Sequence, residues 1–151
     1  MEDDILILGG GAAGLMAAIA AKRAAPGARV TILEAGDRVG KKILSTGNGR
    51  CNLTNLRARA GDYAPAPVGA VLGQFPPERV LAAFAQMGLC FREEEDGRVY
   101  PASDAASSVL DALRLTCAHL GVRERTGFLA VRARRGREGF TLEAEGGERA
   151  Q

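Results

Sequence analysis

The sequence has few of the residues from which proteins build metal centres and disulfide scaffolds. Its 151 residues include one histidine, three cysteines and no tryptophan. The cysteines lie far apart and form no C-x-x-C pair, so we interpret them as reduced thiols and expect no bound metal. Cys51 has no second cysteine within a few residues, which excludes a flavin-linked disulfide centre and favours a small structural residue.

Long apolar runs and a strong charge imbalance are also missing. The apolar stretch at 14–21 is shorter than the ~20 residues that cross a bilayer. The acidic start at 2–4 lacks the positive charge of a secretory signal, so we expect a cytoplasmic protein with no membrane partner. A net charge of +2 argues against nucleic acid as a partner. The expected partner is a small-molecule substrate. The oligomeric state is not indicated.

A glycine cluster near the N-terminus is the strongest local signal. The apolar run at 4–8 predicts a strand, and Gly9, Gly11 and Gly14 follow it in the G-x-G-x-x-G spacing of dinucleotide-binding turns. In this motif the first glycine permits the turn, the second lets a pyrophosphate approach the backbone, and the third lets the helix pack on the strand. We predict a helix over about 11–25, whose first N–H groups, around Ala12 and Ala13, face the anion.

An acidic residue follows the next predicted strand at a suitable distance. Glu34 ends the strand predicted at 28–33 and lies 20 residues after Gly14. A carboxylate there accepts hydrogen bonds from ribose hydroxyls and disfavours a 2′-phosphate. The sequence therefore predicts that this site binds FAD or NAD rather than NADP. Ala35, which follows Glu34, is expected to border the same nucleotide.

The segment 35–75 is predicted to be a long irregular cofactor loop. It is polar and glycine-rich, and long loops inside compact domains are usually functional. Gly47 and Gly49 alternate with Asn48 and Arg50, a pattern that can form an anion-binding nest of backbone N–H groups. A Walker A loop is excluded, because only three residues separate Gly36 from Gly40 and a lysine stands where the hydroxyl is needed.

The block at 39–55, VGKKILSTGNGRCNLTN, together with the glycine turn and Glu34, resembles the HI0933-like flavoprotein family of NAD(P)/FAD-dependent, aminoacetone-oxidase-like oxidoreductases. Some of its relatives reduce bile-acid enones. The usual block, GKKxxxSGGGRCNxTN, differs here at Thr46 and Asn48; asparagine tolerates the left-handed conformation, so we expect the loop shape to survive. The resemblance implies that FAD lies along 42–52. The expected cofactor residues are Gly9, Gly11, Ala12, Ala13, Gly14, Glu34, Ala35, Lys41, Lys42, Ser45, Thr46, Gly47, Asn48, Gly49, Arg50, Cys51, Asn52 and Phe128.

The sequence after residue 75 predicts two further segments. Residues 76–120 are expected to form a helix, a hairpin turning at Asp96-Gly97, and a second helix capped by Ser103 or Asp104. The acidic run at 93–96 is interpreted as a solvated tip. Residues 121–146 predict a third parallel strand and a β-meander, with six arginines of 123–137 on a solvated face. By the same resemblance, the backbone near Phe128 meets the adenine.

The predicted fold class is α/β: a Rossmann-like FAD-binding domain of the two-dinucleotide-binding-domain flavoprotein type, with a parallel sheet plus a β-meander. We expect one partial domain over 1–151, incomplete at the C-terminus, because the resemblance covers only the first part of a family member. The favoured function is the FAD-binding part of an oxidoreductase, with NAD(P)H as a candidate electron donor. The alternatives are an inactive nucleotide-binding fragment and an NAD-binding domain without flavin. No residue is indicated as the catalytic acid or base.

Overall fold

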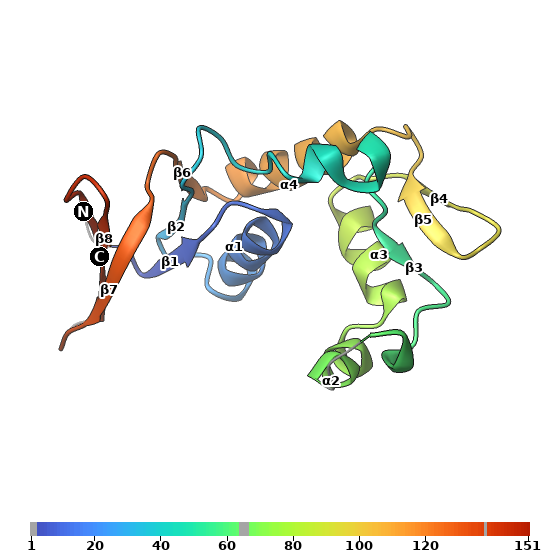
Figure 1. Ribbon diagram of the computed structural model, residues 1–151, viewed down its shortest axis with the longest axis horizontal. Coiled ribbons are helices and arrows are strands. Elements are labelled where there is room, and N and C mark those ends of the chain that lie inside the picture. The colour runs from blue at the N-terminus through green and yellow to red at the C-terminus, as the bar shows by residue number, and fades with distance from the viewer. Residues whose placement is uncertain (1–2, 64–66, 138) are drawn as a thin grey trace. The chain divides into compact units, whose positions relative to one another are not determined.

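The computed structural model describes residues 3–63, 67–137 and 139–151. The chain divides into two compact units, each with its own sheets and helices (Figure 1). Unit 1 contains Met1–Lys42 and Leu113–Gln151, and unit 2 contains Ile43–Ala112. The expected single domain over 1–151 stays a prediction.

A parallel three-stranded sheet forms the centre of unit 1. The strand order is β1-β2-β6, so β2 lies between the other two. Its central position explains why all four of its side chains are buried. Helix α1 makes the crossover from β1 to β2, which is the predicted β-α-β unit. The bounds are β1 (Ile5–Leu8), α1 (Ala12–Ala24), β2 (Val30–Leu33) and β6 (Arg123–Arg125).

The two faces of this sheet pack against different elements. Ile7 of β1 faces α1, because a Cβ built on Gly14 would lie 3.5 Å from its side chain. Side chains alternate along a strand, so Leu6 points to the opposite face. There it packs on an apolar cluster that includes Leu33, Phe128 and Leu142. That second layer is an antiparallel meander of order β7-β8-β9, with strands β7 (Ala130–Arg135), β8 (Phe140–Ala144) and β9 (Arg149–Ala150).

Unit 2 is built around a small antiparallel sheet of order β3-β5-β4. The β4–β5 hairpin turns at 94–97, where the N–H of Gly97 donates to the carbonyl of Glu94 over 2.8 Å. This confirms the predicted Asp96-Gly97 hairpin. The elements are η1 (Ile43–Gly49), β3 (Thr54–Asn55), η2 (Ala60–Asp62), α2 (Pro67–Gln74), α3 (Pro77–Gln86), β4 (Phe91–Glu93) and β5 (Arg98–Pro101).

The two predicted helices of this region are confirmed. Pro77 occupies the first turn of α3, and Gly88 follows its C-cap with φ +80°. Helix α4 (Ala106–His119) buries an apolar face, with Leu113 and Cys117 almost fully buried. The helix passes from unit 2 into unit 1 between Ala112 and Leu113.

Two details of the predictions are wrong. The expected irregular segment at 35–75 contains the strand β3 and the helix α2. The pairing of β3 with β5, which lies more than 40 residues later, is not visible in a local sequence pattern. The carboxylate of Asp104 does not cap α4: it binds two arginines, and α4 begins two residues later at Ala106.

Candidate nucleotide-binding site

The glycine turn lies at the carboxyl end of β1, where ligands bind in open α/β sheets. Gly9 has φ +92°, a conformation that only glycine adopts readily, and its N–H donates to the carbonyl of Leu33 over 2.8 Å. A Cβ on Gly14 would collide with the carbonyl oxygen of Gly9. Gly9 therefore has the backbone conformation that the motif requires, and Gly14 has the close backbone contact.

The outer side of the turn is open for a ligand. A Cβ on Gly11 would meet no atom within 4 Å, and Gly11, Ala12 and Ala13 are all exposed. Gly11 is the N-cap of α1 and makes no side-chain cap, so the first N–H groups of the helix keep their outward direction. This geometry fits the phosphates of a dinucleotide, whose charge is favoured at a helix N-terminus.

The half-buried side chain of Glu34 lies beside the turn. Its Oε2 accepts the N–H of Gly10 over 2.6 Å, and its Oε1 accepts the N–H of Gly36 over 2.8 Å. The carboxylate that was predicted to bind ribose is thus within hydrogen-bond distance of the glycine turn. Sequence reasoning missed Gly10 and Gly36, because it assigned roles only to the motif positions.

Phe128 lies next to Glu34 through the backbone. The N–H of Phe128 donates to the carbonyl of Glu34 over 2.9 Å, and the N–H of Gly127 donates to the carbonyl of Gly36 over 2.9 Å. The ring of Phe128 is 1% exposed, with the Arg125 guanidinium 4.7 Å from its centroid. The structure therefore brings the segment at 127–128 to the strand end that carries Glu34, and the adenine contact stays a prediction.

The predicted site also includes two lysines of unit 1. Both Lys41 and Lys42 are exposed. Lys41 forms an ion pair with Asp37 at 3.3 Å, and its hydrogen bond lowers the pKa of that carboxyl. An exposed pair of this kind holds its lysine loosely, so Lys41 can change partner at low cost.

The remaining predicted cofactor residues, 45–52, lie in unit 2 and form their own compact turn. The hydroxyl of Thr46 donates to the carbonyl of Ile43 over 2.6 Å, and the carbonyl of Thr46 accepts the N–H of Cys51 over 3.0 Å. Asn48 has φ 53° and ψ 41°, so asparagine does adopt the left-handed conformation expected of it. Ser45, Gly47 and Gly49 are exposed, whereas the side chains at Cys51 and Arg50 are half-buried.

Arg50 is the charged residue of this loop, and its guanidinium binds protein groups. It contacts Glu94 at 2.5 Å and Asp104 at 2.8 Å, and it lies 3.9 Å from the centroid of the Tyr100 ring. The hydrogen bond to Arg50 lowers the pKa of Asp104. Hydrogen bonds to Glu94 and Asp104 raise the pKa of Arg50 further.

The partners of Arg50 form a cluster with Arg92, which also binds Asp104. Asp104 has φ 54°, an uncommon conformation for a non-glycine residue. The interpretation of 93–96 as only a solvated tip is wrong for Glu94, which binds Arg50. Sequence reasoning missed Glu94, Asp104 and Arg92 as a cluster, because their partners lie 12 to 54 residues away.

The cysteines differ in exposure: Cys90 is exposed, Cys51 is half-buried and Cys117 is buried. None of the three forms a disulfide. Burial raises the pKa of the Cys117 thiol to about 11, and that thiol lies 3.7 Å from the carbonyl of Leu15. Cys117 is therefore a packing residue.

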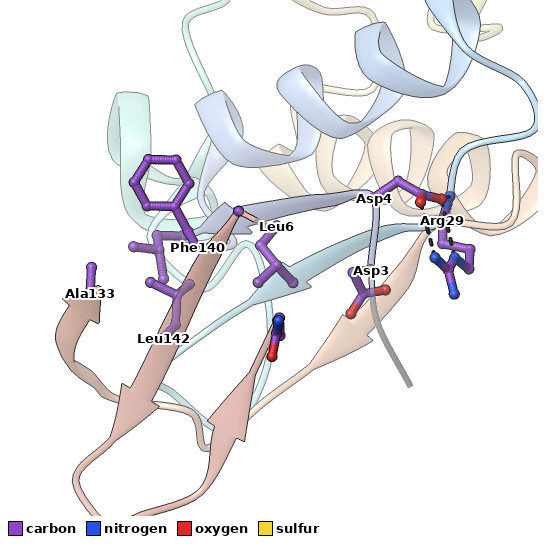
Figure 2. Close-up of a pocket in the computed structure, with 10 residues that line it drawn as sticks. Asp3, Asp4, Leu6, Arg29, Ala133, Phe140 and Leu142 are labelled. Atoms are coloured by element: carbon purple, nitrogen blue, oxygen red, sulfur yellow. Dashed lines mark hydrogen bonds and ion pairs between the residues drawn. The ribbon is translucent and has the colours of Figure 1, made fainter. Parts of the chain in front are cut away.

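A cavity of about 580 Å³ also opens in unit 1 (Figure 2). Leu6, Phe140 and Leu142 give it an apolar lining, and Asp4 and Arg29 bind each other at its edge. It lies on the meander face of the sheet, opposite α1, because Leu6 points there. The predicted cofactor residues do not line it.

The chain matches the family described as HI0933-like protein Rossmann domain over residues 3–151. It belongs to that family. The predicted fold class, a Rossmann-like FAD-binding domain, is confirmed by this match and by the parallel sheet with its glycine turn.

Curated relatives agree with the family. The chain is 43% identical over 143 residues to the 3-dehydro-bile acid delta(4,6)-reductase of Clostridium scindens, covering 93% of this chain and 35% of that protein. It is 31% identical over 146 residues to the ribosomal RNA dihydrouridine synthase of Escherichia coli, covering 95% of this chain and 36% of that protein. The chain thus spans about a third of the length of these relatives.

A solved structure shares the fold. The 3-ketosteroid-delta4-(5alpha)-dehydrogenase of Rhodococcus jostii RHA1 matches with a TM-score of 0.71 at 16% identity, covering 99% of this chain and 43% of that one. Among the described residues, no helix is both long and apolar enough to cross a membrane.

Proposed function

We propose that this chain binds FAD and forms the nucleotide-binding part of an oxidoreductase. The observation that carries the proposal is that three features lie together at the carboxyl ends of the neighbouring strands β1 and β2. These are a turn in which Gly14 has no room for a side chain, the exposed N-terminus of α1, and the carboxylate of Glu34. The resemblance of the block at 39–55 to a flavoprotein family favours FAD over NAD.

Each group of this chain has a defined task toward the nucleotide. The N–H groups at the start of α1 bind the pyrophosphate, and the absence of a Cβ at Gly11 lets it approach. Glu34 accepts hydrogen bonds from the ribose, and the backbone near Phe128 borders the adenine. By the family resemblance, the residues of the turn at 45–52 are also assigned to the cofactor. When bound, FAD supplies the hydride or electron transfer.

The proposed substrate class follows from the names of the two relatives. A 3-dehydro bile acid with delta-4,6 unsaturation and the uracil ring of RNA both contain a carbon–carbon double bond conjugated to a carbonyl. The first enzyme is named as a reductase of such bonds, and the second is named for the product in which the bond is reduced. We therefore assign to the whole protein the reduction of a conjugated double bond in a small molecule, because the bile-acid enzyme is the more similar relative at 43% identity.

FAD binding is tested by titrating the purified chain with FAD and, separately, with NADH. We expect saturable uptake of FAD, with a yellow protein after desalting. A colourless protein that binds NADH and no FAD would show an NAD-binding domain without flavin. Failure to bind either would show an inactive module.

The reaction is tested on the complete polypeptide that the gene encodes, without oxygen. We expect NADH or NADPH to be consumed when a 3-oxo-4,6-diene steroid is present. The saturated steroid is the matched control and should give no consumption. Consumption with an RNA containing uridine, and none with the steroid, would contradict the small-molecule assignment.

A further inference from the structure

The carboxylate of Glu34 accepts a hydrogen bond from the glycine turn and another from its own segment. Its two oxygens accept N–H groups from two different segments, Gly10 in the turn and Gly36 after β2. The contact with Gly10, over 2.6 Å, ties the βα turn to the end of β2, and the contact with Gly36, over 2.8 Å, holds the carboxylate within its own segment. A residue whose only task was to bind ribose would not need either contact.

Gly10 is held from both sides. Its N–H goes to Glu34, and its carbonyl accepts the N–H of Gly40 over 2.7 Å. A Cβ on Gly10 would lie 2.5 Å from Cγ1 of Val39 and 3.2 Å from Oε2 of Glu34. The middle residue of the turn is therefore buried between the side chains of Val39 and Glu34, although the motif leaves its identity open.

The acceptor capacity of the carboxylate allows a second task. An ionised carboxylate has about four lone-pair sites, two on each oxygen. The bonds to Gly10 and Gly36 use one site on each oxygen. One site on each remains, which matches the two hydroxyls of a ribose.

We propose that Glu34 is a positioning residue for the glycine turn as well as the ribose acceptor. By holding the N–H of Gly10, it keeps Gly11 and the start of α1 in the conformation that receives the pyrophosphate, before the nucleotide arrives. Preformed geometry of this kind strengthens binding because less ordering is left to do. The proposal rests on the proposed nucleotide binding and adds to it a contribution of Glu34 to phosphate binding.

The test compares two ligands on two forms of the chain. ADP and 2′,3′-dideoxy-ADP are titrated into the wild type and Glu34→Ala. If Glu34 only binds ribose, the substitution leaves the affinity for dideoxy-ADP unchanged. The proposal requires Glu34→Ala to weaken dideoxy-ADP as well, by about tenfold for the lost hydrogen bonds to a charged group. Equal affinity of both forms for dideoxy-ADP overturns it.

Amide hydrogen exchange without nucleotide provides a second measurement. Glu34→Gln has almost the same shape, but its amide has one acceptor oxygen and one donor nitrogen, so it cannot accept from both Gly10 and Gly36. We expect at least one of these two amides to exchange about tenfold faster. Glu145→Gln, at an exposed carboxylate of the same unit, is the matched control and should change neither amide.

The outcomes separate the two proposals. If wild-type chain binds neither ADP nor dideoxy-ADP, nucleotide binding fails, while the exchange rates still decide whether Glu34 holds the turn. If Glu34→Gln does not fold, amide exchange is measured on the wild-type chain alone. Fast exchange at Gly10 and Gly36 contradicts the proposal, and slow exchange at both supports it.

Discussion

Two glycine-rich turns carry the predicted cofactor residues, and they are stabilised in different ways. The turn at 9–14 in unit 1 is fixed by backbone geometry, by the absence of a Cβ at Gly14, and by one carboxylate. The turn at 46–52 in unit 2 is fixed by a charged side chain, Arg50, which is bound to Glu94 and Asp104. Both turns contain a glycine with no room for a Cβ, since one on Gly47 would lie 2.8 Å from the backbone N of Asn52, but only the second also depends on a long charged side chain.

This difference determines which substitutions each turn tolerates. A methyl group is the harmful change in the first turn, because it meets a fixed backbone atom. In the second turn the loss of the Arg50 charge is harmful as well, because it leaves Glu94 and Asp104 with Arg92 alone. The predictions that follow test this contrast.

The largest effect is expected for Gly14→Ala. Its Cβ would collide with the carbonyl oxygen of Gly9, which belongs to the backbone and cannot move away cheaply. We expect a loss of about 3 kcal/mol in the free energy of unfolding, typical of a severe overpacking change. Denaturant unfolding followed by circular dichroism measures it.

Gly11→Ala is the matched control for that substitution. Its Cβ points into open space, so we expect less than about 1 kcal/mol of lost stability, together with weaker binding of ADP. Similar unfolding free energies for the two variants would show that the close approach at Gly14 is not what constrains the turn.

A smaller effect is expected for Arg50→Met, which keeps much of the side-chain length and removes the charge. The turn at 46–52 loses its contacts with Glu94, Asp104 and the Tyr100 ring. We expect several-fold faster amide exchange in this turn, measured by mass spectrometry of peptides that cover it, and no change at 9–14.

Arg50→Lys should not restore the slow exchange, since an ammonium cannot reproduce the planar contacts of the guanidinium. Arg79→Met is the control: Arg79 is an exposed arginine of the same unit, beside the Phe75 ring. Unchanged exchange at 46–52 in Arg50→Met would mean that the turn holds its shape without the charged cluster.

The contrast between the turns also explains what could be predicted from the sequence. Gly9, Gly14 and Glu34 were predictable because their spacing reflects local backbone geometry within one β-α-β unit. The roles of Glu94 and Asp104 were not, because their contacts with Arg50 span 44 and 54 residues and arise only after β4 and β5 pair. The contact of Glu34 with Gly10 was missed for a different reason: the motif describes where glycine is required and not which N–H groups are bound.

The smallest effect is expected on the pH dependence of stability. The hydrogen bond from Arg50 lowers the pKa of Asp104 below its ordinary value of 3.8. The stabilising contribution of Asp104 is therefore complete above that value and is lost as the pH falls through the lower pKa of the folded state. We expect Asp104→Asn to be less stable than wild type at pH 7, with the difference shrinking below about pH 4.

Denaturant unfolding at a series of pH values measures this difference, with Asp111→Asn, at an exposed position on α4, as the control. A stability difference that stays constant from neutral to strongly acidic pH would contradict the role of the Asp104 charge.

The position of β6 in the sheet has a consequence for the time course of synthesis. Leu33 in β2 pairs with Arg125 in β6, so the central strand acquires its second neighbour only after about 90 further residues have been translated. At about 5 to 20 residues per second, the ribosome needs roughly 5 to 20 s for this stretch. Throughout that interval, one edge of an apolar strand has no partner on the nascent chain. The whole of unit 2 is made within this interval, so this strand edge stays unpaired while unit 2 is synthesised.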